Sequence, residues 1–358
     1  MTATSDVRPV LTCALPHAEG ERVQLGHGSG GRLSATLFRD RFLPHFRNPE
    51  LERLGDGAVL HLSNGRGSGT EVVFSTDTFV VSPLEFPGGN IGSLAVHGTV
   101  NDLAMMGGTP QYLSAGFVLE EGLPFDLLDR IVASMGKAAR EAGVLLVTGD
   151  TKVVERGKAD GLYVNTTGIG VVSPEFRPAP DRAREGDAVL VSGPIGRHGM
   201  AIMAAREDLG LRTTIESDSA SLFPLVARLR DALGNDVRVL RDATRGGVAS
   251  ALNEISVASG VGISLGVDIP VPAAVHAACE MLGLDPLYVA NEGVLVALVP
   301  SGRAEEALGA LRGHPLGREA AIIGRAVGEH PGMVVMRTGL GGSRIVDLLP
   351  GDQLPRIC

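Results

Sequence analysis

The chain has 358 residues, a length that predicts two domains. A hydrophobic fraction of 44% excludes a disordered protein, and a net charge of −9 with no tryptophan argues against the basic, aromatic surfaces that bind nucleic acid. No apolar run has the length of a membrane helix and the start has no signal-peptide pattern, so we expect a cytoplasmic protein without a membrane partner. Glycine is the outlier, with 49 residues, about twice its usual share.

Runs of strand length and helix length alternate along the chain, which predicts an α/β fold with mixed sheets in two domains. Residues 1–22 have prolines and charges without periodicity and are expected to form a loose arm. The N-terminal domain is expected over 23–172, a proline-rich linker over 173–186, and the C-terminal domain over 187–338. Residues 339–358 are rich in glycine and proline and are predicted to form a mobile tail.

The predicted elements follow from apolar spacing and from Gly and Pro punctuation. In the N-terminal domain they are a helix over 33–46, strands over 57–62 and 71–81, a helix over 91–106, a strand over 111–119, a helix over 125–142, and strands over 144–147 and 161–172. In the C-terminal domain they are strands over 188–192, 261–267, 293–299, 320–327 and 332–337, and helices over 198–208, 219–233, 246–259, 272–282 and 303–312.

Five aspartates stand beside glycines, small hydroxyl residues or an amide, and several directly follow an apolar run. They are Asp56, Asp77, Asp102, Asp150 and Asp242, with Asn101, Thr151 and Thr244 as neighbours. Any one of them could simply cap a turn or a helix. Clustered carboxylates repel one another unless a cation lies between them. The set therefore predicts a magnesium-nucleotide site.

Two glycine-rich stretches are candidates for phosphate binding. The stretch 242–247 opens into a predicted helix, where backbone N–H groups and Arg245 could bind an anion, with Gly246 leaving the backbone accessible. The alternative is a plain junction between a loop and a helix. The stretch 26–31 matches the spacing of a dinucleotide-binding loop, but its leading strand is short and the expected acidic residue is missing. A flap over nucleotide phosphates or a bare turn fits it better.

Three further polar residues have two interpretations each. Lys152 follows Asp150 and is either a surface charge or a group that stabilises a transferring phosphoryl charge. Glu292 interrupts an apolar stretch and is either a turn residue or a general base whose pKa is raised by its surroundings. His97 lies one helical turn before Asn101 and is interpreted as a core histidine.

The three cysteines fit neither a disulfide framework nor a zinc site. Cys13 falls in the loose arm, and Cys279 falls in an apolar helix as a core residue. Cys358 is the last residue of a Gly- and Pro-rich tail. A thiol on a swinging arm can carry a covalent group between sites, so the sequence predicts a carrier role for Cys358.

Several motifs together resemble the hydrogenase maturation family HypE, of the aminoimidazole ribonucleotide synthetase (PurM-like) superfamily. They are Pro-Arg-Ile-Cys at 355–358, Phe-Pro-Gly-Gly-Asn-Ile-Gly at 86–92, Val-Thr-Gly-Asp-Thr-Lys-Val-Val at 147–154, Leu-Arg-Asp-Ala-Thr-Arg-Gly-Gly at 240–247 and Ala-Asn-Glu-Gly at 290–293. The resemblance extends from about residue 23 to the C-terminus. These motifs are specific in combination.

The resemblance implies an ATP-dependent carbamoyl dehydratase that makes the cyanide ligands of [NiFe]-hydrogenase. The carbamoyltransferase HypF would place a carboxamide on Cys358, and phosphorylation of the amide oxygen followed by loss of phosphate would leave a thiocyanate. Cyanide would then pass to iron on a HypC–HypD complex. By family position, Lys152 stabilises charge and Glu292 removes protons. The five aspartates match magnesium and nucleotide positions of the superfamily.

The resemblance also implies a homodimer, in which N-terminal strands of two chains form one β-barrel. Sequence leaves open whether the tail enters its own subunit's site. One alternative is a selenophosphate-synthetase-like enzyme, but the loop at 26–31 lacks the cysteine or selenocysteine that such an enzyme uses. A second alternative is a non-catalytic carrier whose tail position is controlled by ATP.

Overall fold

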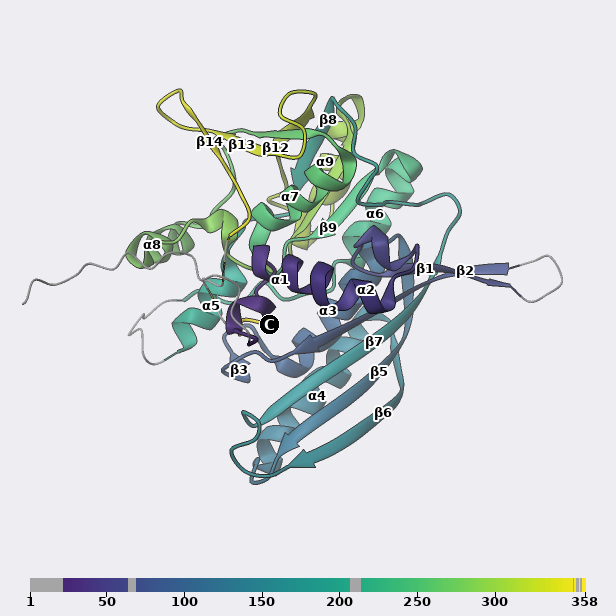
Figure 1. Ribbon diagram of the computed structural model, residues 1–358, viewed down its shortest axis with the longest axis vertical. Coiled ribbons are helices and arrows are strands. Elements are labelled where there is room, and N and C mark those ends of the chain that lie inside the picture. Colours follow the sequence, from purple (N-terminus) through teal and green to yellow (C-terminus); the bar gives the residue numbers. More distant parts are fainter. Residues whose placement is uncertain (1–21, 64–68, 207–213, 350, 352–353, 355) are drawn as a thin grey trace, which may run out of the picture.

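The computed structural model describes residues 22–63, 69–206, 214–349, 351, 354 and 356–358. Within them the chain forms an N-terminal and a C-terminal α/β half, each built on one large sheet (Figure 1). No helix among the described residues is both long enough and apolar enough to span a bilayer. The predictions for the loose arm and for Cys13 fall almost entirely outside the described residues.

The N-terminal sheet has the strand order β1-β2-β7-β5-β6, with β5 and β6 parallel and the other neighbours antiparallel. Its strands are β1 (Ala58–Ser63), β2 (Gly69–Phe79), β5 (Gly108–Glu120), β6 (Leu145–Val154) and β7 (Leu162–Val172). A small hairpin of β3 (Glu85–Phe86) and β4 (Gly89–Asn90) precedes the first long helix.

Helices α3 (Ile91–Met105) and α4 (Phe125–Ala142) lie on one side of this sheet. Helix α3 begins at a cap in which the Asn90 side chain accepts from the N–H groups of Gly92 and Ser93. Most of its residues are buried because it contacts β2, β5, β7 and α4. Helix α4 has one buried face and one exposed face. It ends at Gly143, which lies in the left-handed region, where the sequence predicted the end of the helix.

The close approach of α3 to α4 depends on Gly92. A Cβ at this position would lie 2.3 Å from the Ile131 carbonyl oxygen, so the backbones would have to separate. We expect Gly92→Ala to lower the free energy of unfolding by about 1–3 kcal/mol. In Gly136→Ala, on α4, the nearest atom is the end of the Arg140 side chain at 3.4 Å, and the free energy should rise by about 0.5–1 kcal/mol. Urea denaturation measures both, and equal losses would contradict the packing argument.

The C-terminal sheet has the order β14-β13-β10-β12-β8-β11-β9 and is antiparallel apart from the β10–β13 pair. Its strands are β8 (Asp187–Val191), β9 (Val239–Asp242), β10 (Gly262–Leu265), β11 (Leu295–Pro300), β12 (Ala321–Val327), β13 (Val334–Arg337) and β14 (Ser343–Ile345). Alternate residues of β8 and β11 face two separate apolar clusters. One contains α7 (Gly247–Ser259), and the other contains α6 (Phe223–Leu233) and α9 (Ala304–Arg312).

The remaining helices connect these layers. Helices α5 (Arg197–Ala205) and α8 (Ala273–Leu282) contact each other and share an apolar cluster with the N-terminal domain and with Leu354 and Ile357 of the tail. Cys279 of α8 is 1% exposed, so its interpretation as a core residue is confirmed. Helices α1 (Arg32–Leu37) and α2 (Leu43–Phe46) are joined by a π-helical turn at Phe38–Phe42.

Two predictions of secondary structure were wrong in detail, and one strand was missed. The single helix expected over 33–46 is divided by the π-helical turn. The strand expected over 144–147 is only the start of β6, which continues through polar residues to Val154 because they pair with β5. Strand β9 was not predicted, since its four residues sit between a short connection and the 242–247 turn.

Candidate functional site

A cavity of about 260 Å³ lies between the two halves of the chain. Its lining includes Gly30, Asp56, Thr76, Asp77, Asp102, Arg241, Asp242, Thr244, Arg245, Glu254, Glu292 and Cys358. Strand β2, helix α3 and the residues before β1 supply the carboxylates from the N-terminal half. The end of β9, the turn into α7 and the loop before β11 supply the groups from the C-terminal half. The cavity therefore gathers side chains that are far apart in the sequence.

Three carboxylates converge in this cavity. One oxygen from each of Asp56, Asp102 and Asp242 lies within 4.8 Å of the others. Ser75 Oγ lies 2.7 Å from Asp102 Oδ2 and 2.9 Å from the Asp56 carbonyl oxygen, and so connects two of them. Asp56 Oδ2 and Asp242 Oδ2 are buried with no hydrogen-bond partner among the described residues. Such orphaned carboxylate oxygens are ligands that fit a hard divalent cation such as Mg²⁺.

The electrostatics of the cluster support the same conclusion. Burial raises the pKa of Asp102 and of Asp242 well above the usual aspartate value, and neighbouring carboxylates raise both further. The pKa of Asp56 rises to about 6, mainly through burial, although Arg241 lowers it. The pKa of Asp77 is also raised by burial. When no cation is bound, the ionisation of one of these carboxyl groups makes the ionisation of the others less favourable.

This competition predicts how the stability of the metal-free protein depends on pH. A carboxyl group whose pKa is raised by folding stabilises the folded state at low pH, and that stability is lost as pH rises through the folded value. We expect the melting temperature to fall as pH rises through about 6, where Asp56 ionises, and to fall further as Asp102 and Asp242 ionise. Asp242→Asn removes one of the competing charges and should raise the melting temperature at pH 8 by a few degrees.

Calorimetry from pH 5 to 8 provides the test, with Asp268→Asn as the control at an exposed position in the loop after β10. The control should leave the pH profile unchanged. A lower melting temperature for Asp242→Asn at pH 8 would contradict the repulsion argument and favour a structural capping role for this carboxylate.

Glu292 is 3% exposed and lines the cavity from the loop before β11. Its backbone N–H donates to Asp218 Oδ1 at 3.0 Å, which fixes the loop. Burial, followed by the charges of Asp242, Asp77 and Asp218, raises the pKa of Glu292 well above the usual value, while Arg245 lowers it. A carboxylate with a raised pKa is a stronger proton acceptor.

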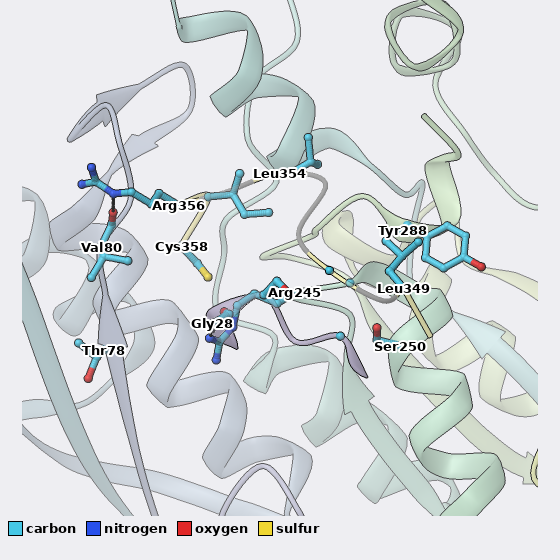
Figure 2. Close-up of a pocket in the computed structure, with 15 residues that line it drawn as sticks. Gly28, Thr78, Val80, Arg245, Ser250, Tyr288, Leu349, Leu354, Arg356 and Cys358 are labelled. Atoms are coloured by element: carbon cyan, nitrogen blue, oxygen red, sulfur yellow. Dashed lines mark hydrogen bonds between the residues drawn. The ribbon is translucent and has the colours of Figure 1, made fainter. Parts of the chain in front are cut away.

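The 242–247 turn contributes backbone as well as side chains to the site. Gly246 and Gly247 both have positive φ, and a Cβ on Gly246 would lie 2.0 Å from Ser250 Oγ. The glycine-rich stretch at 26–31 packs against this turn, where Arg245 Nη1 donates to the Gly28 carbonyl at 3.0 Å. Together they line a smaller pocket of about 70 Å³ that adjoins Cys358 (Figure 2).

Cys358 lines both pockets of its own chain. In Figure 2 its sulfur points towards Gly28 and Arg245. The negative charge at Cys358 is the largest cause that raises the pKa of Arg245. In this conformation the tail enters the cavity of its own chain.

Asn101, a predicted nucleotide-binding residue, and the neighbouring His97 are not among the residues that line the cavity. Asn101 Oδ1 accepts from the Leu222 N–H at 2.7 Å and its Nδ2 donates to the Ala220 carbonyl at 3.1 Å, so its amide is used to hold the chain together. His97 Nδ1 lies 3.0 Å from Ser219 Oγ, and burial lowers the pKa of His97 to about 4. This supports the interpretation of His97 as a core histidine.

Asp150, Thr151 and Lys152 lie outside this cavity. They are exposed residues of β6, and Lys152 Nζ contacts Asp150 Oδ2 at 2.6 Å. The sequence pattern placed them in one site with the other four aspartates, but within one chain the structure does not bring them into that cavity.

Arg241 was not assigned a role from sequence. Its guanidinium is largely buried, lies 3.1 Å from Asp56 Oδ1 and also pairs with Glu254. It offsets part of the negative charge of the cluster. No sequence signal singles it out, because its two partners come from distant positions.

Two family models match the chain: the N-terminal domain of AIR synthase related protein over 54–172 and the C-terminal domain over 184–336. The carbamoyl dehydratase HypE of Azotobacter vinelandii is 55% identical over 338 residues, covering 94% of this chain and 97% of that protein. These matches support the predicted α/β fold with mixed sheets and two superfamily domains.

Solved structures agree with the sequence comparison. A chain from a HypE–HypF complex has a TM-score of 0.82 and 46% identity, covering 87% of this chain and 99% of that chain. The structure of HypE in complex with ATP has a TM-score of 0.77 and 51% identity, covering 93% and 98%. The chain belongs to the HypE family of carbamoyl dehydratases of hydrogenase maturation.

Proposed function

We propose that this chain uses ATP to dehydrate a carboxamide carried on Cys358 to a thiocyanate. The observation that carries the proposal is the position of the C-terminal thiol, which lines the same cavity as Glu292 and the aspartate cluster. A carboxamide on that sulfur would face a buried proton acceptor and a site for a cation and phosphates. The product would supply cyanide to the iron of [NiFe]-hydrogenase.

In the reaction, the carboxamide oxygen attacks the γ-phosphate and ADP leaves. The C–O bond then breaks with phosphate as the leaving group, and the nitrogen loses its two protons to form the C≡N bond. Hydroxide leaves poorly from carbon, whereas phosphate leaves well, which is why ATP is consumed. Glu292 accepts a proton from the amide nitrogen, and the low exposure of its side chain keeps it basic. Arg245 and the turn at 242–247 orient the phosphates.

Mg²⁺ would be held by Asp56, Asp102 and Asp242, whose carboxylate oxygens converge and are partly unpartnered. Asp77 faces the same cavity and completes the acidic wall. Bound there, the cation would neutralise charge on the polyphosphate. Thr244 and Gly246, at the turn into α7, would also take part in binding the nucleotide.

We also propose a homodimer through the face of the N-terminal sheet opposite α3 and α4. An apolar row crosses this face: Phe74 pairs with Ile169, Ile169 with Tyr112, and Tyr112 with Leu145, all of them exposed. On the described chain, β6 forms an outer edge of the sheet, and its residues 145–153 are exposed. A second copy of the chain on this face would bury the apolar row and cover the exposed strand β6.

The dimer gives Asp150, Thr151 and Lys152 a route to an active site. Register places Asp150 and Lys152 on the same open face as the apolar row. We propose that the Lys152 of one chain stabilises transferring charge in the cavity of the other chain, with Asp150 and Thr151 beside it.

Complementation between two inactive variants tests this arrangement. Mixed dimers of Lys152→Ala with Glu292→Gln should regain dehydration activity, because one of their two cavities has both groups intact. Lys152→Ala alone and Glu292→Gln alone should be inactive. Lys158, an exposed lysine beyond the end of β6, provides the control variant Lys158→Ala, which should be active by itself. Mixed dimers without activity would contradict action across the interface.

The proposed reaction requires one partner that loads Cys358 with the carboxamide and another that receives the cyanide. A HypF carbamoyltransferase would load Cys358, and a HypC–HypD complex would receive the cyanide at its iron. Both proposals rest on family membership, and a relative has been crystallised in a HypE–HypF complex. A cytoplasmic location stays a prediction.

Intact-protein mass spectrometry tests the proposed reaction. Carbamoylated chain incubated with Mg-ATP should lose the mass of one water molecule. The competing function is a non-catalytic carrier, in which ATP only controls the tail. That function would gain support if ATP were hydrolysed while the mass stayed that of the carboxamide, and the dehydratase proposal would fail.

A further inference from the structure

The last three residues of the chain are held by backbone pairing with the segment that follows β2. The Val80 N–H donates to the Cys358 carbonyl oxygen at 3.1 Å, and the Ser82 N–H donates to the Arg356 carbonyl oxygen at 3.1 Å. Arg356 Nε donates to the Val80 carbonyl at 3.1 Å, a contact drawn in Figure 2. The tail thus docks as a short extended segment.

Two side chains of the C-terminal domain bind the carbonyl groups of this segment. His198 Nε2 lies 2.6 Å from the Ile357 carbonyl oxygen. Arg206 donates through Nη2 to the Arg356 carbonyl and through Nε to the Ser82 carbonyl, each at 3.0 Å. Arg206 therefore bridges the tail and the segment beside it. The Ile357 side chain is 5% exposed, so its apolar contacts support the docked position.

The tail carbonyl determines which nitrogen of His198 carries the hydrogen. Burial lowers the pKa of His198 to about 4, so the ring is neutral and has a single N–H. A carbonyl can only accept, which places this hydrogen on Nε2. Nδ1 then accepts from Ser217 Oγ at 2.8 Å, and the ring packs edge-on against Phe86. When the tail leaves, the buried Nε2–H loses this acceptor.

Hydrogen bonds connect helix α5, which contains His198, to the loop that contains Glu292. The Gly196 N–H donates to Asn291 Oδ1 at 2.6 Å, and the Gly199 N–H donates to the Ala290 carbonyl at 3.0 Å. These bonds join the start of α5 to the residues directly before Glu292. The position of the tail carbonyl relative to Glu292 is therefore set by a few buried contacts.

We propose that His198, assisted by Arg206, is a positioning residue that latches the tail backbone and places the group on Cys358 next to Glu292. The role of these contacts in dehydration rests on the proposed function. The contacts themselves hold the docked tail independently of that function. Neither residue touches the reacting atoms. Their effect passes through the carbonyl groups of Arg356 and Ile357.

The test measures how readily the Cys358 thiol is alkylated by a maleimide, with the modified residue identified by peptide mass spectrometry. His198→Ala should speed alkylation about tenfold, as loss of one buried hydrogen bond would. His198→Gln, whose amide can donate to the same carbonyl, should return the rate towards that of the parent chain. His276→Ala, at an exposed position on α8, should leave it unchanged.

Further measurements separate the latch from general damage. In single turnovers, His198→Ala should slow dehydration while the affinity for Mg-ATP stays constant. Arg206→Ala provides a second variant in case His198→Ala does not fold, and it should also speed alkylation. Unchanged alkylation in both folded variants would overturn the proposal. If the parent chain does not dehydrate its carboxamide while the variants still alkylate faster, the proposed function fails and the latch stands.

Discussion

Replacing Glu292 by glutamine is expected to slow dehydration of the carbamoylated chain by about 10²–10⁴-fold, the range for loss of a general base. Glutamine has nearly the same size and shape as glutamate and can still form hydrogen bonds, but its amide cannot act as a base. The carboxylate of Glu292 lines the cavity beside Cys358, and its pKa is raised mainly by burial. Single-turnover mass spectrometry measures the rate, and equilibrium dialysis measures the affinity for Mg-ATP, which should change little.

A matched control is available in Glu216→Gln, at an exposed glutamate of the segment before α6. This variant should dehydrate at the parent rate. Normal dehydration by Glu292→Gln would show that another group removes the proton, with bound water or Lys152 as the remaining candidates.

Replacing Cys358 by serine is expected to abolish both loading and dehydration. A serine hydroxyl is a far weaker nucleophile than a thiolate at neutral pH, so no carboxamide would be transferred to the tail. The sulfur lines both pockets, whereas the aspartate cluster lies on other elements of the chain. Binding of Mg-ATP should therefore persist. Intact mass after incubation with a HypF carbamoyltransferase and its substrates measures the loading.

Cys279→Ala is the control for this experiment. Cys279 lies buried in α8, and burial raises the pKa of its thiol to about 11, which makes it unreactive. The variant should load normally. Carbamoylation of the Cys358→Ser chain, or loss of its nucleotide binding, would contradict the carrier role and point to a structural role of the tail.

Local patterns were enough to predict much of the fold and part of the site. Helix α4 has a clean apolar period and a terminal glycine, and its predicted bounds match the structure. Asp56, Asp102 and Asp242 were grouped with Asp77 and Asp150 because each stands close to a glycine, a small hydroxyl residue or an amide, and the structure places the first three together. Their role as metal ligands stays a prediction.

What sequence could not predict depends on contacts between distant segments. Strand β6 has polar residues on an exposed edge, so no apolar period marks its second half. The docking of the tail depends on His198 and Arg206, which are more than a hundred residues from the carbonyl groups they bind. Nothing in the local sequence of α5 signals such a partner. The same holds for Arg241, whose carboxylate partners lie on other elements.

The most direct test of the central claim follows one oxygen atom. The chain is loaded on Cys358 with a carboxamide that carries a heavy oxygen isotope, and Mg-ATP is added in ordinary water. If the amide oxygen is phosphorylated and leaves with phosphate, the released inorganic phosphate should carry the label in proportion to the thiocyanate formed. Unlabelled phosphate alongside a retained carboxamide would mean that ATP is hydrolysed by water, and would contradict the dehydration mechanism.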